Sequence, residues 1–351
     1  MSKHHSSKAE PDEIPASVNP HLQKRKRAHF STEVYIQEIL AQNRMMLSRA
    51  MTLVESKRLV DRQQARAIVE ACLPHSGQSF RLGITGVPGV GKSTFIESFG
   101  LRLIEKGHKV AVLTVDPSSQ LSKGSILGDK TRMAQLSVHQ QAFIRPSPAG
   151  QSLGGVAAKT RELILLCEAA GFDFIIIETV GVGQSEVAVH ALTDFFLLLL
   201  LPGAGDELQG IKRGVVEMAD MIAVNKADGD RKLAAQKAKT AYQRALHLFP
   251  PKPSNWVAKA VICSALENEG IALIIENLTK YQEQTSKTAY FEKHRQKQAI
   301  HWFKQSLKES LLARFFDNDE FNTKMKLLEA EVGHGLISPQ AAVEALMDKM
   351  L

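Results

Sequence analysis

This 351-residue chain contains the stretch Gly86-Val87-Pro88-Gly89-Val90-Gly91-Lys92-Ser93, which matches the pattern G-x-x-x-x-G-K-[ST]. That pattern requires a strand before it and a helix after it. The apolar run Arg81–Thr85 precedes it, and the helical pattern Lys92–Lys106 follows it. In this setting the glycines let backbone N–H groups turn towards phosphate oxygens, and the positive end of the helix faces the same anion. The stretch therefore predicts a nucleoside triphosphate site.

Three side chains at the start of the predicted helix have expected roles at this site. We expect the Lys92 ammonium to reach the β- and γ-phosphates of the nucleotide. We expect the Ser93 hydroxyl to bind Mg²⁺, with Thr94 beside it in contact with the nucleotide. Mg²⁺ is thus the predicted cofactor.

Short apolar runs alternate with helical patterns from Phe80 to about Tyr281. Helical stretches separate the runs, for example Val156–Ala170 and Arg231–Leu248. The alternation predicts an α/β protein with the P-loop fold, in which helices flank a mostly parallel central sheet. Six runs are predicted as its buried strands: Arg81–Thr85, Lys109–Val115, Phe172–Ile177, Phe195–Leu201, Met221–Val224 and Val257–Cys263.

The patterns divide the chain into four predicted segments. These are a disordered polar tail (1–30), an N-terminal helical extension (31–78), an α/β domain that the motifs below identify as a GTPase domain (79–282) and a C-terminal helical arm (283–351). Appended helices of this kind either serve association or pack on their own domain.

Apolar spacing predicts the helices of the extension and the arm. Apolar residues at three- and four-residue steps between Thr32 and Val54 predict one helix, and a second is expected over Asp61–Leu73. Ser338 and Pro339 predict the start of a short last helix. In the arm, one predicted helix face carries Ile300, Phe303, Leu307, Leu311 and Phe315.

Composition excludes several classes of protein. Apolar residues make up 44% and charged residues 23%, which is typical of a folded protein and excludes a chain disordered throughout. The longest apolar run, Phe195–Leu201, is far shorter than the ~20 residues that a membrane-spanning helix needs. The scattered cysteines Cys72, Cys167 and Cys263 are typical of a reducing compartment. We therefore predict a cytoplasmic protein with no membrane partner.

The net charge of +7 raises the question of nucleic acid, but much of the basic excess is local. Lysine and arginine occupy positions 24–27, within the polar tail. We interpret this run as part of a solvated or disordered tail, with a nuclear signal or a phosphate-binding patch as the alternatives. No nucleic-acid partner is predicted.

The motif Asn225-Lys226-Ala227-Asp228 follows the predicted strand Met221–Val224. N-K-x-D at the end of a strand is the guanine-recognition motif of GTPases. The Asp228 carboxylate can accept hydrogen bonds from guanine N1–H and from the exocyclic amine, whereas adenine has neither donor there. A site built around such donors rejects an analogue that lacks them by about 10⁴-fold or more. We expect the Lys226 stem to lie over the ring and Asn225 to brace the loops.

The residues Ser264-Ala265-Leu266 follow the next predicted strand. A backbone N–H in this segment can reach guanine O6. We therefore expect these three residues to complete the recognition of the base.

Glu178-Thr179-Val180-Gly181 follows the predicted strand Phe172–Ile177 and has the layout of a γ-phosphate sensor. The Gly181 N–H can bond the γ-phosphate and release it after hydrolysis. Glu178 stands where most GTPases have Asp, so we expect it to meet Mg²⁺ through water. Val182 stands where Ras-like enzymes have the glutamine that orients the attacking water. Hydrolysis should therefore be slow or use another group, of which Gln184 is the nearest polar candidate.

Two further acids lie in the loops expected to cover Mg²⁺ and the attacking water. Asp116 ends the second predicted strand, and Asp129 lies in the motif Gly128-Asp129-Lys130-Thr131-Arg132-Met133. We predict that both act at the metal; the alternative is a pair of solvated loop acids.

A third loop, Pro202–Lys212, follows the most apolar strand. Its three glycines and two adjacent acids indicate a mobile functional segment. The alternative is an ordinary strand–helix loop in which Asp206 caps the following helix.

At these motifs the chain resembles the MeaB/ArgK GTPases of the dimeric SIMIBI class of P-loop proteins. The resemblance covers about Leu47–Ile275 and includes GVPGVGKST, VDPSS, GSILGDKTRM, FIRPSPAGQSLGGVA, IIIETVGVGQSE, PGAGDELQGIKRG and NKAD. It implies a homodimer formed largely by the C-terminal arm, and a cycle of GTP binding and hydrolysis to GDP that drives a partner.

In the family that it resembles, the partner is an adenosylcobalamin-dependent acyl-CoA mutase, usually methylmalonyl-CoA mutase. The GTPase gates cofactor loading and protects the mutase from inactivation. The cobalamin belongs to the mutase, so no cobalamin of its own is expected in this chain.

The resemblance also carries roles over to individual residues. Lys92, Ser93, Asp116, Asp129 and Glu178 match the nucleotide and magnesium cluster. A third switch, which senses nucleotide and partner, is matched by Asp206, Gln209 and Lys212.

Three other functions remain as alternatives. An accessory ATPase or kinase of an arginine/ornithine transport system is disfavoured by Asp228 and by the lack of a kinase catalytic loop. A nickel or cobalt metallochaperone GTPase would need a cysteine cluster or a histidine-rich tract, and the adjacent pair His4-His5 lies in the tail. A regulatory switch whose output is unrelated to cobalamin stays open.

The phosphate loop gives the first testable prediction. Lys92→Ala should lower GTP turnover by at least about 10²-fold with the fold intact. The negative charge on the transferring phosphoryl group would no longer be stabilised by the lysine ammonium. Phosphate release measures turnover, and circular dichroism checks the fold. Lys106→Ala, at the far end of the same predicted helix, is the control. Unchanged turnover in Lys92→Ala would remove the phosphate-loop argument.

Overall fold

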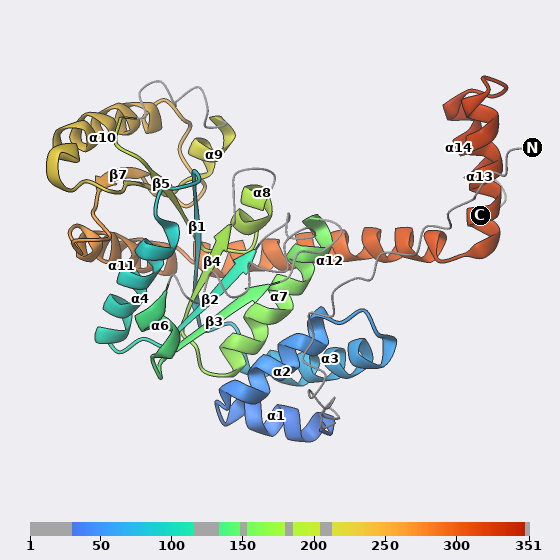
Figure 1. The fold of residues 1–351 in the computed structure, drawn as a ribbon, viewed down its shortest axis with the longest axis horizontal. Helices are drawn as coiled ribbons and strands as arrows, with labels where there is room; N and C mark the ends of the chain where they lie inside the picture. The colour runs from blue at the N-terminus through green and yellow to red at the C-terminus, as the bar shows by residue number, and fades with distance from the viewer. Residues whose placement is uncertain (1–29, 116–132, 148–152, 180–184, 204–212, 348–351) are drawn as a thin grey trace, which may run out of the picture. The chain divides into compact units, whose positions relative to one another are not determined.

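The computed structural model describes residues 30–115, 133–147, 153–179, 185–203 and 213–347 (Figure 1). Within these ranges seven strands form one sheet in the order β3-β2-β4-β1-β5-β6-β7, and every neighbouring pair is parallel. The predicted α/β fold is therefore confirmed. The strands are β1 (Phe80–Gly86), β2 (Val110–Val115), β3 (Ala142–Ser147), β4 (Phe174–Thr179), β5 (Phe195–Leu200), β6 (Met221–Val224) and β7 (Lys259–Ile262).

Helices cover both faces of the sheet, with α4 and α11 on one face and α7 and α8 on the other (Figure 1). Alternate side chains of a strand point to opposite faces, and so Leu82 and Ile84 of β1 join Phe95 and Phe99 of α4 in one core cluster. The helices of this domain are α4 (Lys92–Glu105), α6 (Ala134–Val138), α7 (Leu153–Ala169), α8 (Ser185–His190), α9 (Arg213–Met218), α10 (Lys232–Leu246) and α11 (Ile271–Lys287).

The N-terminal extension contains three helices, one more than the apolar spacing predicts: α1 (Thr32–Leu40), α2 (Arg44–Glu55) and α3 (Leu59–Cys72). The single helix expected between Thr32 and Val54 is wrong, because Asn43 starts a new one. Its side-chain oxygen accepts from the N–H groups of Met45 at 3.0 Å and Met46 at 3.3 Å. An Asn side chain that caps a helix in this way satisfies donors that a continuous helix would use internally.

Strand β3 is not among the strands predicted from sequence. Its six residues include Arg145 and Pro146, which interrupt the apolar pattern. Proline lacks the N–H that a central strand needs, and β3 lies at the edge of the sheet, next to β2. Arg145 forms an ion pair with Glu55 of α2, which ties this edge to the N-terminal helices.

The arm consists of α12 (Tyr290–Phe316), α13 (Asp319–Gly333) and α14 (Pro339–Met347). Trp302 of α12 donates its indole N–H to Ala191 O at 3.2 Å, and Gln298 donates to Thr193 O at 2.8 Å. Further along α12, Phe303, Leu307 and Leu311 of the predicted face are exposed. Within the described residues, no helix has the length and apolar character that crossing a membrane requires.

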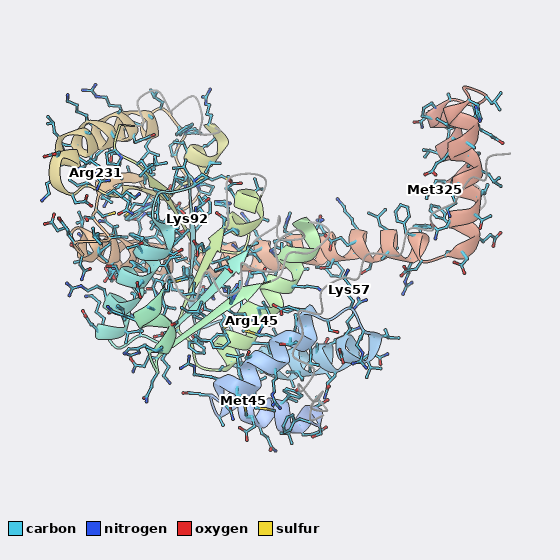
Figure 2. All side chains as sticks on the ribbon, viewed as in Figure 1. Met45, Lys57, Lys92, Arg145, Arg231 and Met325 are labelled. Atoms are coloured by element: carbon cyan, nitrogen blue, oxygen red, sulfur yellow. The ribbon has the colours of Figure 1, made fainter. Side chains whose placement is uncertain are left out.

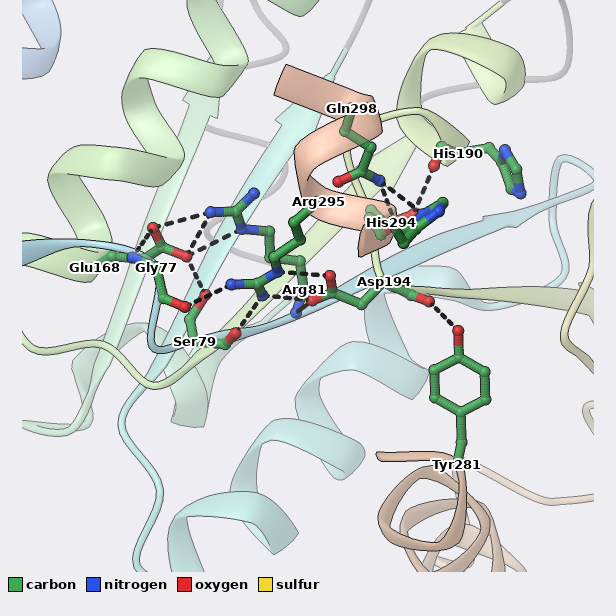
Figure 3. Close-up of polar contacts among 11 residues, drawn as sticks. Gly77, Ser79, Arg81, Glu168, His190, Asp194, Tyr281, His294, Arg295 and Gln298 are labelled. Carbon is green, nitrogen blue, oxygen red and sulfur yellow. Dashed lines mark hydrogen bonds and ion pairs between the residues drawn. The ribbon is translucent and has the colours of Figure 1, made fainter. Parts of the chain in front are cut away.

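A buried ion network holds α12 and α7 to the amino ends of β1 and β5 (Figure 3). Glu168 of α7 accepts from Arg81 through two hydrogen bonds of 3.0 Å and from the Ser79 hydroxyl at 2.6 Å. Asp194 accepts from Arg295 of α12 at 2.9 Å and 2.7 Å, and from the Arg81 backbone N–H at 2.8 Å. The Glu168 and Asp194 side chains are each 1% exposed, so each carboxylate depends on these donors.

This network predicts a large stability cost for a small change. Glu168→Gln should lower the free energy of unfolding by about 3 kcal/mol or more, because it leaves the Arg81 cation without its buried partner. The matched control is Glu105→Gln, which removes an exposed Arg–Glu pair and should cost less than about 1 kcal/mol. Urea unfolding of both variants measures the difference. Equal shifts in the two variants would contradict a stabilising buried network.

Candidate nucleotide-binding site

The phosphate loop lies between β1 and α4, at the carboxyl end of the central strand. Gly89 has φ +76° and Gly91 has φ +89°, in the left-handed region that favours glycine. A Cβ on Gly86 would lie 2.5 Å from Leu199 O, so the loop also needs glycine where it passes β5. The predicted loop is therefore held in a tight turn directly before a helix N-terminus, which is the geometry that binds phosphate.

Lys92 begins α4, at the place labelled in Figure 2. Its ammonium donates to Gly86 O at 2.9 Å. Burial lowers the pKa of Lys92, and the carboxylates of Glu178 and Glu186 oppose the shift. Glu178 is the penultimate residue of β4 and is 4% exposed. The structure thus brings the predicted phosphate-binding lysine and the predicted metal-site acid into one electrostatic environment. Ser93 and Thr94 follow Lys92 in the first turn of α4.

Asn225 joins the phosphate loop to the segment after β7. Its side-chain nitrogen donates to Val90 O at 2.8 Å, and its side-chain oxygen accepts from Ala265 N at 3.1 Å. The residue is 1% exposed. One amide therefore fixes the distance between the predicted phosphate and base loops, which is the bracing role that the sequence indicates. Lys226 has φ +58° and follows directly.

Asp228 is already hydrogen-bonded within the chain. One carboxylate oxygen accepts from the Ser264 hydroxyl at 2.9 Å, and the other pairs with Arg231. The Ser264 hydrogen bond, followed by Arg231, holds the pKa of Asp228 below its ordinary value. The carboxylate is therefore ionised at neutral pH and available as an acceptor for the donors of guanine.

The segment Ser264-Ala265-Leu266 lies beside Asp228, as the spacing of the motifs predicts. Ser264 pairs with Glu269 through two backbone hydrogen bonds of 3.0 Å, which close a short turn. Ala265 O accepts from the Ser98 hydroxyl of α4 at 3.0 Å. Leu266 is 80% exposed at the tip of the turn.

Two residues of this site were not predicted from sequence, Arg231 and Ser98. Arg231 stands three positions after Asp228, a spacing that favours an ion pair and could have indicated it. Ser98 contacts Ala265 across 167 positions of the chain, and no local pattern signals such a contact.

Seven predicted site residues lie outside the described residues: Asp116, Asp129, Gly181, Gln184, Asp206, Gln209 and Lys212. The strands before their segments, β2, β4 and β5, end at the same edge of the sheet as β1, because all are parallel to it. Within the described part of the chain, no group of three or more His, Cys, Asp or Glu side chains is arranged to hold a metal ion.

Comparison with known proteins decides the family. The family model described as "Methylmalonyl Co-A mutase-associated GTPase MeaB" matches residues 47–320. The chain belongs to the MeaB family. Among curated relatives, a probable GTPase of Mycobacterium tuberculosis is 47% identical over 306 residues, covering 87% of this chain and 91% of the relative. GTPase ArgK of Escherichia coli is 43% identical over 305 residues, covering 87% and 92%.

A mammalian protein and a solved structure extend the comparison of this MeaB-family chain. The mitochondrial methylmalonic aciduria type A homolog of Mus musculus is 42% identical over 332 residues, covering 92% of this chain and 80% of that protein. The crystal structure of a LAO/AO transport system kinase has a TM-score of 0.73 and 36% identity, covering 91% and 97%. With relatives that are GTPases and a phosphate loop in place, the MeaB-family chain is a GTPase.

The base-recognition geometry gives a specificity prediction. Asp228→Asn should weaken GTP binding by about 10²-fold or more and favour xanthosine triphosphate, because the new amide can donate to the xanthine C2 oxygen. Competition with a fluorescent nucleotide measures both affinities. Asp230→Asn, two residues further on and exposed, is the control. A variant that keeps its preference for GTP would contradict the role of Asp228 in reading guanine.

Proposed function

We propose that this GTPase is a chaperone that gates cofactor loading and protects an adenosylcobalamin-dependent acyl-CoA mutase, with methylmalonyl-CoA mutase as the client. The carrying observation is the match of residues 47–320 to a family described by its association with that mutase. The name of the mouse relative, which refers to methylmalonic aciduria, supports the same client.

Within this proposal the phosphate loop and the acids at the sheet edge hold the nucleotide and its metal. Lys92 contacts the β- and γ-phosphates, and Ser93 provides a hydroxyl for Mg²⁺. The oxygen donors of Ser93 and Glu178 fit a magnesium ion, which prefers oxygen ligands. When bound, Mg²⁺ neutralises charge on the β- and γ-phosphates. We assign Asp116 and Asp129 to the same metal shell.

The remaining predicted residues complete the proposed GTP cycle. Gly181 senses the γ-phosphate, and Gln184 is the nearest polar candidate for orienting water. Asp206, Gln209 and Lys212 form a third switch that responds to nucleotide and partner. Asn225, Lys226 and Asp228 recognise guanine together with the loop at Ser264-Ala265-Leu266, whose hydrogen bonds to Asn225 and Asp228 support this role.

We also propose a homodimer formed through the C-terminal arm (283–351). The support is an exposed apolar stripe on α12, in which Ile300 is 56%, Phe303 67%, Leu307 49% and Leu311 47% exposed. These residues recur at three- and four-residue steps and so lie along one side of the helix. A soluble chain that exposes such a stripe gains free energy by covering it. A second copy of the same arm provides a matching surface.

A cytoplasmic location is part of the proposal. Cys72, Cys167 and Cys263 are buried free thiols, and burial raises the pKa of Cys72 to about 11 and that of Cys263 to about 12. Buried, protonated thiols of this kind persist in a reducing compartment.

A second candidate function is an accessory NTPase or kinase of an arginine/ornithine transport system. The solved structure at 36% identity, which is described as a LAO/AO transport system kinase, favours it. The guanine-type acceptor at Asp228 supports the chaperone proposal instead, since a kinase using ATP would leave that carboxylate without its base donors.

The client is tested by GTP turnover of the purified protein, alone and with a purified adenosylcobalamin-dependent methylmalonyl-CoA mutase. We expect slow turnover of GTP, little of ATP, and stimulation by the mutase of about tenfold, equivalent to ~1.4 kcal/mol of transition-state stabilisation. The rate of mutase inactivation during catalysis, with and without the GTPase, is the second measurement.

Two controls make the result specific. Lys92→Ala should neither hydrolyse GTP nor protect the mutase, and an unrelated protein at equal concentration should not stimulate. GTP turnover that the mutase does not change would support the GTPase activity and contradict the proposed client. A preference for ATP would favour the transport-system function.

A further inference from the structure

A cavity of about 210 Å³ lies at the amino end of the sheet, at the edge opposite to the phosphate loop. It opens between β1, α7, α12 and the segment that follows α8. Residues from each of these elements line it: Arg81, Arg161, Leu192, Arg295 and Trp302. The volume is far larger than the ~15 Å³ of probe-occupied space that one water needs.

The lining is strongly basic. Three guanidinium groups, those of Arg81, Arg161 and Arg295, face the cavity, and the described residues that line it include no Asp or Glu. Two carboxylates behind the wall already have partners, because Glu168 pairs with Arg81 and Asp194 pairs with Arg295. A third, that of Glu162, follows Arg161 in α7 and acts on its charge without forming an ion pair with it. Two of the three arginines are therefore paired with a buried carboxylate, and the third, Arg161, is not.

Arg161 is the arginine of this lining that lacks an ion-pair partner among the described residues. It makes no hydrogen bond or ion pair with any of the described residues, although it is only partly exposed. Burial lowers the pKa of Arg161, and the neighbouring charge of Arg81 lowers it further, with Glu162 opposing. A guanidinium in this position is stabilised by an anion that enters the cavity.

Arg81 has donors left for the same anion. Its hydrogen bonds to Glu168 use Nε and Nη2, so that the two N–H groups of Nη1 remain (Figure 3). Arg295 is fixed by Asp194 and by the Gly77 carbonyl at 2.6 Å, which holds its charge at the wall. Three arginines thus meet at the cavity. Arg161 has no partner among the described residues, Arg81 keeps the donors of Nη1, and Arg295 is held in place by Asp194 and Gly77.

We propose that this cavity is a second anion site, separate from the nucleotide, that binds a small oxyanion through Arg161 and Arg81. Inorganic phosphate and a small carboxylate share the required chemistry. The bound anion links α7 to β1 next to the anchor of α12, so that it stabilises the docking of the arm. The site does not depend on the identity of the client, because it is built from residues of this chain alone.

The test uses the full chain with Mg²⁺ and a non-hydrolysable GTP analogue, so that the phosphate loop is filled. Inorganic phosphate and, separately, succinate are titrated at constant ionic strength, with chloride as the reference salt. We expect phosphate to raise the melting temperature more than chloride does. Arg161→Gln should weaken the apparent affinity at least about tenfold, because a charge-assisted contact is lost.

Two further variants separate binding from folding. Arg161→Lys keeps the charge without the fork of donors and should retain part of the response. Arg66→Gln, an exposed arginine of α3, should respond as the wild type does. GTP turnover measured without added phosphate should be unchanged in all variants, which distinguishes loss of this site from failure of the nucleotide site.

Two outcomes of the titration distinguish a built anion site from a general effect of salt. A response to succinate rather than phosphate, lost in Arg161→Gln, supports the site and assigns it to a carboxylate. A response no larger than that to chloride, or an Arg161→Gln variant that responds as the wild type does, overturns the proposal.

Discussion

The parallel pairing of β1 with β4 on one side and β5 on the other is the constraint on which the site depends. All parallel strands end at one edge, so that segments far apart in the chain meet there. The phosphate loop follows β1, Glu178 lies at the carboxyl end of β4 next to its last residue, and Asn225 follows β6. The site is therefore assembled from several segments that the parallel pairing of the strands brings together. The Asn225 side-chain amide then fixes the spacing between two of the loops.

The two edges of the sheet differ in chemistry. At the carboxyl edge lie the phosphate loop and the carboxylates of Glu178 and Asp228, which we propose bind the nucleotide and its metal. At the amino edge, arginines and buried carboxylates attach α12. The short helix α8 connects the two edges: it starts directly after segment 180–184 and ends at His190, next to Ala191, which accepts from Trp302 of α12. The arm is thus attached to the residues that follow a proposed nucleotide sensor.

Sequence patterns predicted the fold where the physical signal is local. Continuous apolar runs identified six of the strands, because strands covered on both faces carry few polar residues. They did not identify β3, whose Pro146 is tolerated only at an edge position that the sequence does not reveal. The helix predicted from apolar spacing is interrupted at Asn43, because the Asn43 side chain caps α2 and so starts a new helix there. In the site, the local motifs were predictable, whereas the contact of Ser98 with Ala265 depends on the tertiary fold.

The partners of Asp228 explain how one carboxylate can be held in place and still recognise a base. Its pair with Arg231 is exposed on the arginine side, at 53%, and pairs that water reaches in this way contribute little to stability. The hydrogen bond from Ser264 is buried and is costly to lose. A carboxylate offers about four acceptor positions, so guanine can displace or share with Arg231 while Ser264 stays bound. Adenine brings no donors to these positions. Opening the ion pair between Asp228 and Arg231 would then gain no hydrogen bond in return.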